Sequence, residues 1–165
     1  MLVRGLGRAH PGGAAAAGSV PGEAAVSAEG CPACTGEWPA RAHRILDCGT
    51  SVAYLHDDQF FPGWSVLVLK RHATELWQLA PAERSALMDE LTRVAQALAA
   101  GFDAVKMNYE LLGNQVAHIH WHLIPRRADD PAPRVPAWTV AHEPRRLAPA
   151  EMAERVARIR ARLGA

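Results

Sequence analysis

Histidine and apolar residues alternate in the segment VAHIHWHLI, residues 116–124, and this alternation restricts the local structure more than any other feature of the chain. A period of two is typical of a β-strand, whose successive side chains point to opposite faces. The pattern predicts a strand with His118, His120 and His122 on one face. The apolar set on the other face is Ala117, Ile119, Trp121 and Leu123. We expect the apolar face to pack in the core and the histidine face to be functional or solvated.

Strand and helix patterns follow one another along the first part of the chain. Three short apolar runs, residues 43–48, 51–56 and 63–70, predict an antiparallel meander in which the last strand is central. From Pro81 the period changes, because apolar residues recur at steps of three and four. This spacing predicts an amphipathic helix that ends near Gly101.

The second part of the chain returns to strands and ends in a helix. Residues 104–112 resume the strand pattern, and the Gly and Asn in residues 113–115 suit a tight turn into the histidine strand. Residues 129–138 are rich in proline and are predicted to be irregular, whereas residues 148–164 predict a second amphipathic helix. The sequence therefore predicts an α+β fold with a mainly antiparallel sheet of about five strands, one long helix and a C-terminal helix.

Length and charge limit the kinds of partner. A chain of 165 residues with 49% hydrophobic content is long enough to bury the core of one domain. Its 18 basic and 17 acidic residues are scattered, which argues against nucleic acid or a membrane surface as partner but permits a small anionic ligand. No apolar stretch approaches the ~20 residues that a membrane-spanning helix needs.

The N-terminal segment differs in composition from the rest. Residues 1–30 are rich in Ala, Gly and Pro and lack periodicity, so we expect a disordered tail followed by a single domain over residues 31–165. The tail lacks the continuous apolar region of a secretory signal. The odd number of cysteines, three, does not suggest a disulfide framework, and together these features predict a cytoplasmic protein.

The histidine row is too long to hold one metal ion with all three side chains. On an extended strand His118 and His122 lie about 13 Å apart, at ~3.3 Å per residue. Bonds near ~2.1 Å cannot span that distance, although a neighbouring pair could bind a metal. The alternative is phosphoryl or nucleotidyl transfer, because an imidazole can attack phosphorus while its neighbours orient it or protonate a leaving group. The remaining alternative is three unrelated histidines on a solvated strand.

The segment HIHWHLI resembles the His-x-His-x-His-x-x signature, with apolar x, of the histidine triad family of nucleotide hydrolases and transferases. The resemblance extends from about Cys31 to Pro125 and includes the segment FPGWSVLVLKRH. The segment NYELLGNQVAHIHWHLIPR is similar to a bacterial branch of the family. The resemblance implies a histidine triad fold, a homodimer formed by joining sheets edge to edge, and chemistry that needs no cofactor.

The resemblance also implies a role for each residue of the site. His120 matches the nucleophile that takes a nucleoside 5′-phosphate as a phosphoramidate, later released to water. His122 matches the residue near the phosphate and the leaving group, and His118 the residue that fixes the middle imidazole. Asn108 and Gln115 match polar positions that contact the phosphate.

Two positions depart from the family pattern. Trp64 stands where many members have a further active-site histidine, and we expect it to be a core or groove-lining aromatic. His56 falls where members often place Asn or Asp on the ribose hydroxyls, so either a ribose contact or a plain turn position fits it. These departures leave the identity of the substrate open.

The pair Cys31 and Cys34 forms a Cys-x-x-Cys motif directly after the predicted tail. Some members of the family bind zinc through such a pair, a histidine after the strand and the first triad histidine, which here implies Cys31, Cys34, His72 and His118. Two thiolates and two imidazoles suit a structural zinc site with tetrahedral geometry. A pair of small buried cysteines without metal is the alternative.

The sequence supports one leading function and two alternatives. The leading hypothesis is a hydrolase or transferase that acts on a small nucleotide, either a dinucleoside polyphosphate or a nucleoside phosphoramidate, through His120. A non-catalytic nucleotide- or partner-binding protein is the second, since Trp64 and His56 depart from the pattern. A metalloenzyme with a histidine pair on a catalytic metal is the third.

Overall fold

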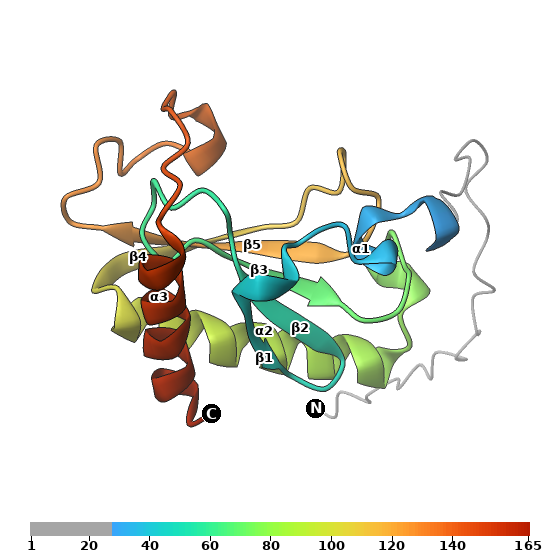
Figure 1. The fold of residues 1–165 in the computed structure, drawn as a ribbon. Helices are drawn as coiled ribbons and strands as arrows, with labels where there is room; N and C mark the ends of the chain where they lie inside the picture. Colours follow the sequence, from blue (N-terminus) through green and yellow to red (C-terminus); the bar gives the residue numbers. More distant parts are fainter. Residues whose placement is uncertain (1–27) are drawn as a thin grey trace, which may run out of the picture.

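The computed structural model describes residues 28–165, so residues 1–27 of the predicted tail lie outside the described part (Figure 1). Within it, five strands form one sheet in the order β1-β2-β3-β5-β4, and every neighbouring pair is antiparallel. The strands are β1 (Arg44–Asp47), β2 (Ser51–Leu55), β3 (Ser65–Leu69), β4 (Ala104–Glu110) and β5 (His120–Arg127). The helices are α1 (Pro32–Thr35), α2 (Pro81–Gly101) and α3 (Pro149–Leu163), with short 3-10 turns at Ala28–Gly30, Arg41–His43, Leu76–Gln78 and Ala137–Thr139. The α+β prediction with about five antiparallel strands is confirmed.

Helix α2 covers one face of the sheet, and its bounds match the prediction. Pro81 occupies its first turn, where the missing N–H group is tolerated. Its buried side chains recur at the predicted three- and four-residue steps: Leu87, Leu91, Val94, Ala95 and Leu98. Each buried leucine contributes about 1.5–3 kcal/mol of hydrophobic stabilisation. They pack with side chains of β2, β3 and β5 to form the main core.

Helix α3 packs beside α2 and against β1, and it buries Met152, Val156 and Ile159 in the same core. The chain between β5 and α3 is irregular apart from the turn Ala137–Thr139, as the proline-rich composition predicts. This connection and the segment around α1 lie on the side of the sheet opposite α2 (Figure 1). Both segments therefore lie over the face that carries the histidines.

The predicted bounds of the histidine strand and its turn are wrong. Strand β5 begins at His120, so His118 precedes it, and residues 111–119 form a long connection instead of a tight turn. The reason is the hydrogen-bond partner of Ile119. Its N–H group donates to the Ala73 carbonyl in the loop after β3, at 2.7 Å, and not to a residue of β4. The histidine face is also not solvated, since His118, His120 and His122 are 2%, 5% and 6% exposed.

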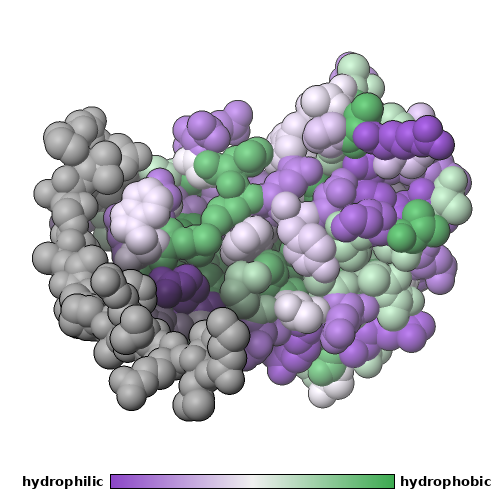
Figure 2. Space-filling model, turned by 180° about the vertical axis from the view of Figure 1, so that it is seen from behind, coloured by the Kyte–Doolittle hydropathy of each residue, from purple (hydrophilic) through white to green (hydrophobic). Residues whose placement is uncertain are grey.

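Hydrophobic and hydrophilic residues are interspersed on the surface seen from behind (Figure 2). The large apolar side chains that remain exposed include Val105, Tyr109 and Leu112, on or just after the edge strand β4. No helix within residues 28–165 is both long and apolar enough to cross a lipid bilayer.

Candidate active site and metal cluster

Strand β5 holds the second and third histidines on the sheet face that points away from α2. It lies between β3 and β4, and His120 and His122 stand directly opposite Val68 and Val66 of β3. Opposed residues of an antiparallel pair share a face. The intervening Trp121 and Leu123 therefore point toward the main core, as the alternation predicts. The two imidazole rings are 5.2 Å apart between centroids.

His118 is oriented by a backbone carbonyl. Its Nε2 lies 2.7 Å from the Leu69 oxygen, which can only accept, so Nε2 carries the proton and Nδ1 carries a lone pair. That Nδ1 lies 3.4 Å from Cys31 Sγ and 3.5 Å from Cys34 Sγ. Burial lowers the pKa of His118, which keeps the ring neutral and suited to bind a cation.

His120 is oriented in the opposite sense. Its Nδ1 lies 2.7 Å from the His118 carbonyl oxygen, so Nδ1 donates and the lone pair resides on Nε2. Burial lowers the pKa of this imidazole, which is therefore neutral near pH 7. The Trp38 ring packs against this imidazole in a T-shaped arrangement, with the ring centroids 4.8 Å apart. The fixed tautomer gives His120 a nucleophilic nitrogen without the need for a separate base.

His122 receives a hydrogen bond from a tryptophan. The Trp64 indole Nε1–H donates to His122 Nδ1 at 3.1 Å, which places the His122 proton on Nε2. Burial and the neighbouring His120 and His56 lower the pKa of His122 to about 3. His122 therefore offers a neutral N–H donor over the whole range near neutral pH.

Gly63 makes this placement of Trp64 possible. Its φ of +89° is favourable only for glycine, and the ring of Phe102 fills the space where a β-carbon would stand. The tight bend is held by Gln59, whose Oε1 accepts from Gly63 N–H at 3.0 Å and whose Nε2 donates to the Trp64 carbonyl at 2.9 Å. Trp64 is thereby buried beside His122, in agreement with the predicted core or groove-lining role.

The four residues proposed as zinc ligands come together in one cluster. One ligand atom from each of Cys31, Cys34, His72 and His118 lies within 4.8 Å of the others. Cys34 Sγ lies 3.4 Å from His72 Nδ1, so both imidazoles present nitrogen to the thiols. Burial and the adjacent Cys31 raise the pKa of the Cys34 thiol to about 11. The donor set and the spacing fit a tetrahedral zinc ion, which would replace the thiol protons.

Three further residues were expected to contact the substrate: His56, Asn108 and Gln115. His56 stacks on Trp64 at 4.3 Å and lies 5.7 Å from the His122 ring. Asn108 lies on β4 on the same sheet face as the histidines, and its Oδ1 accepts from Arg126 Nη1 at 2.6 Å. Gln115 is exposed on the connection between β4 and β5, where its predicted phosphate contact stays a prediction.

Trp38 and Trp138 contact the histidines, and sequence reasoning missed both. Trp138 lies in the turn Ala137–Thr139 and meets the His122 ring at 4.9 Å and the Trp64 ring at 5.2 Å. A cavity of about 420 Å³ beside these rings is lined by His56, Asp57, Asp58, Trp64, Ala137, Trp138, His142, Pro144 and Arg146. Both tryptophans lie in irregular segments, so no periodicity could have indicated their position.

Comparison with known proteins gives one family and many similar structures. The model of the HIT domain family matches residues 39–129. A histidine triad protein from Bradyrhizobium japonicum is 30% identical, with a TM-score of 0.67, over 73% of this chain and 89% of that one. A histidine triad (HIT) protein from Sinorhizobium meliloti is 32% identical, with a TM-score of 0.65, over 70% and 85%.

A zinc-bound histidine triad family protein from Mycobacterium smegmatis is 23% identical, with a TM-score of 0.61, and the match covers 84% of this chain and 96% of that one. This last likeness shows the shared fold alone. A search of curated proteins gives no match.

Proposed function

The chain belongs to the histidine triad family, and on that premise we propose that it is a nucleotide-binding hydrolase or transferase that works through a nucleotidyl-His120 intermediate. The observation that carries the proposal is the orientation of His120. Its Nδ1 is bound to the His118 carbonyl, which leaves the Nε2 lone pair for attack on phosphorus. The substrates we propose are dinucleoside polyphosphates or nucleoside phosphoramidates.

In the first proposed step, His120 Nε2 forms a bond to the phosphorus of the nucleoside 5′-phosphate. The bond from phosphorus to the leaving group breaks, and its electron pair goes to the leaving group. A polyphosphate leaves as an anion, whereas an amine also takes a proton from solvent. The His122 Nε2–H group, fixed by Trp64, donates a hydrogen bond to an oxygen of the reacting phosphate. In the second step water attacks phosphorus and loses a proton to solvent. The phosphorus–nitrogen bond breaks, its electron pair returns to His120 Nε2, and a nucleoside monophosphate is released.

The aromatic cavity beside His122 is the proposed nucleoside site. Its size of about 420 Å³ falls within the range of small-ligand pockets, roughly 300–1,000 Å³. Trp138 offers a ring on which a base can stack, and His56 offers a ring nitrogen to the ribose hydroxyls. Asn108 and Gln115 are proposed on the phosphate side. Arg126 occupies the Oδ1 of Asn108, which leaves the Nδ2 group as a donor.

A structural zinc ion held by Cys31, Cys34, His72 and His118 is also proposed. The ion would cross-link helix α1 and its first flanking residue, which carry Cys34 and Cys31, to the loop after β3 and to His118. The Leu69 carbonyl already directs the lone pair of His118 Nδ1 toward the thiols, as a carbonyl bonded to the far nitrogen of a zinc-bound histidine does.

A homodimer is proposed through the edge of the sheet at β4. This strand pairs only with β5 among the described strands, and it exposes Val105 and Tyr109, which are 68% and 46% accessible. An unpaired edge with apolar side chains favours association with another strand. Light scattering after size-exclusion chromatography is expected to give twice the mass of one chain. In Val105→Lys we expect the measured mass to fall toward that of one chain.

Mass spectrometry of the protein quenched during turnover tests the proposed reaction. With a dinucleoside polyphosphate we expect a nucleoside monophosphate adduct on the peptide that contains His120, and release of nucleoside monophosphate. His120→Asn is expected to lower turnover by roughly three orders of magnitude while circular dichroism stays unchanged. Binding without product for every substrate tried would instead favour the non-catalytic alternative, for which the departures at Trp64 and His56 leave room.

A further inference from the structure

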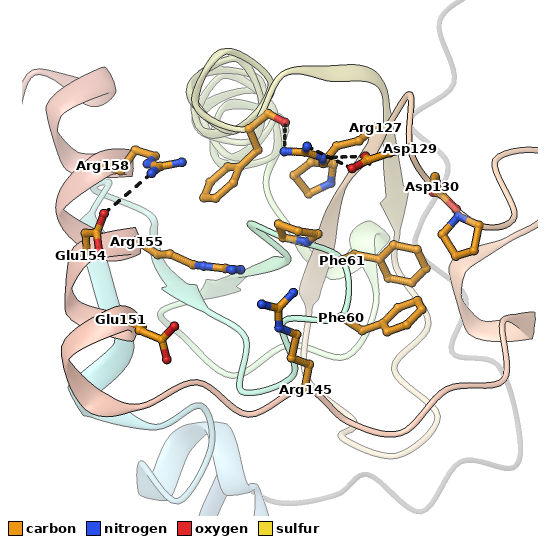
Figure 3. Close-up of a pocket in the computed structure, with 14 residues that line it drawn as sticks. Phe60, Phe61, Arg127, Asp129, Asp130, Arg145, Glu151, Glu154, Arg155 and Arg158 are labelled. Carbon is orange, nitrogen blue, oxygen red and sulfur yellow. Dashed lines mark hydrogen bonds and ion pairs between the residues drawn. The ribbon is translucent and has the colours of Figure 1, made fainter.

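A second hollow lies between α3, the loop after β2 and the C-terminal end of β5 (Figure 3). Its volume is about 480 Å³, and it shares no lining residue with the cavity beside His56. Phe60 and Phe61 line one side of it. The rest of the lining includes four carboxylates and four arginines: Arg127, Arg145, Arg155 and Arg158. The hollow is therefore separate from the proposed nucleoside site and differs from it in chemistry.

Most of the carboxylates around this hollow already have partners. Asp129 accepts a hydrogen bond from Arg127 at 2.9 Å. Asp130 forms an ion pair with the buried Arg126, which does not line the hollow. Glu154 lies 3.8 Å from Arg158, and Glu151 accepts from the Ala148 N–H group at the start of its own helix. The lining is balanced in formal charge. Asp129, Asp130 and Glu154 each have an arginine partner, whereas Glu151 has none within the described part of the chain and, with Glu154, favours the charged form of Arg155.

Two of the arginines project into the centre without such a partner. In Figure 3 the guanidinium groups of Arg145 and Arg155 point into the hollow and toward each other. Over residues 28–165, neither takes part in an ion pair within 4.0 Å. Arg155 is half-buried and donates one N–H group to Gln59 Oε1 at 2.8 Å. Burial and the proximity of Arg145 and Arg158 lower its pKa.

We propose that this hollow binds a phosphate-bearing small molecule, with the phosphate between Arg145 and Arg155 and the rest of the molecule against Phe60. The planar fork of each guanidinium matches two phosphate oxygens, and an anion removes the repulsion between the two cations. Phe60, one face of whose ring stacks on His142 at 4.0 Å, adds an apolar surface to the lining of the hollow. The volume is again that of a small-ligand site, roughly 300–1,000 Å³.

The test uses the full chain and follows amide chemical shifts by NMR during titration with inorganic phosphate, AMP and citrate. Saturable shifts in residues 60–62 and 151–158, which do not line the cavity beside His56, are the expected result with phosphate or AMP. AMP is expected to bind more tightly than phosphate, because its nucleoside part contacts Phe60 as well. Equal binding of AMP and phosphate would refute the contact with Phe60. The absence of such shifts, or shifts with citrate alone, would overturn it.

Variants of equal charge change provide the specificity control. Arg145→Gln is expected to weaken AMP binding at this hollow at least tenfold, whereas Arg162→Gln, on the exposed side of α3, is expected to leave it unchanged. Arg155→Gln is a second test, because it retains an amide donor for Gln59. Equal losses in Arg145→Gln and Arg162→Gln would show nonspecific charge attraction and refute the site. The His120 adduct is measured separately, so failure of the proposed reaction leaves this test intact.

Discussion

Trp64 and His122 are joined by a buried hydrogen bond of 3.1 Å from the indole N–H to the imidazole Nδ1. An indole nitrogen can only donate, so this contact alone decides which nitrogen of His122 carries the proton. Trp64 stands where many family members place a further histidine. The replacement therefore removes one titratable group from the site and fixes the tautomer of another.

Trp64→Phe is expected to reduce turnover about two- to tenfold, the equivalent of one neutral hydrogen bond of ~0.5–1.5 kcal/mol. The phenyl ring retains an aromatic contact for His56 but has no N–H group. Imidazole ¹⁵N shifts should show His122 passing from one tautomer to a mixture of two. Trp138→Phe is the control for this signal, since Trp138 meets the same ring only through a ring contact of 4.9 Å. Unchanged His122 shifts in Trp64→Phe would contradict the assignment.

Stability is expected to fall as the pH is lowered from about 7 to 5. The unfolded chain protonates His122 near its ordinary pKa of 6.5, whereas the folded chain does so only at about 3. The unfolded state thus binds more protons throughout this window, and each such group lowers the free energy of unfolding by at most about 1.4 kcal/mol per pH unit. His118 and His120 act in the same direction because burial lowers their pKa values too.

Urea unfolding of the wild type and of His122→Asn at several pH values isolates this contribution. The variant should show a shallower loss of stability below pH 6.5, because it lacks one buried imidazole. His142, whose pKa is raised through its contacts with the Val140 carbonyl and the Asp58 carboxylate, has the opposite linkage. Protonated His142 stabilises the folded state fully below pH 6.5, and this contribution is lost as the pH rises through the pKa of His142 in the folded protein. The loss is the same in the wild type and in His122→Asn. If the free energy of unfolding falls equally with pH in the wild type and in His122→Asn, His122 is not a neutral buried imidazole.

Periodicity was sufficient for the elements that pack on the core. The bounds of α2 match the prediction, because its buried stripe is a local property of residues 81–101. Strands β1, β2 and β3 were also confirmed to within one or two residues. The start of β5 was not, because Ile119 N–H bonds to the Ala73 carbonyl in the loop after β3, and that partner is 46 positions away. Alternation of side chains reports the strand geometry but not where the ladder begins.

The site was predictable only where a motif marks it. The resemblance placed Cys31, Cys34, His72 and His118 together, and the fold brings their ligand atoms within 4.8 Å. The contacts of Trp38 and Trp138 depend on how irregular segments settle on the sheet. For Trp138 the cause is a small second cluster of Phe61, Trp64, Ile124 and Ala137, which fixes the connection before α3. No local pattern in the sequence encodes that packing.

Loss of a zinc ligand is expected to lower both metal content and stability. Cys34→Ser should reduce bound zinc from one ion per chain toward zero and lower the Tm by about 5 °C or more, at roughly 2–4 °C per kcal/mol for a chain of this size. Cys48→Ser is the matched control, since Cys48 packs at the edge of the main core, apart from the cluster. A chelator should lower the Tm of the wild type and have no further effect on Cys34→Ser. A metal-free wild type with an unchanged Tm in Cys34→Ser would favour a plain pair of cysteines.

Arg126 and Arg127 are adjacent but differ in burial, and they offer a paired test of buried charge. Arg126 is 2% exposed and pairs with Asp130, while its remaining N–H groups bind Asn108 Oδ1 and the carbonyls of Val135 and Ala132. Arg126→Met would leave the Asp130 carboxylate buried and unpaired, which should cost about 3–5 kcal/mol in urea unfolding.

Arg127→Met is the control, because its partner Asp129 is exposed and such pairs contribute about 0–1 kcal/mol. Arg126 also connects β5 to the segment before Trp138, through its hydrogen bond to the Val135 carbonyl. In the fraction of Arg126→Met that folds, we therefore expect KM to rise more than kcat falls. The double variant Arg126→Met with Asp130→Asn should lose less than the sum of the single losses, since neither charge is then left alone. Equal costs for Arg126→Met and Arg127→Met would mean that the buried guanidinium does not hold this connection in place.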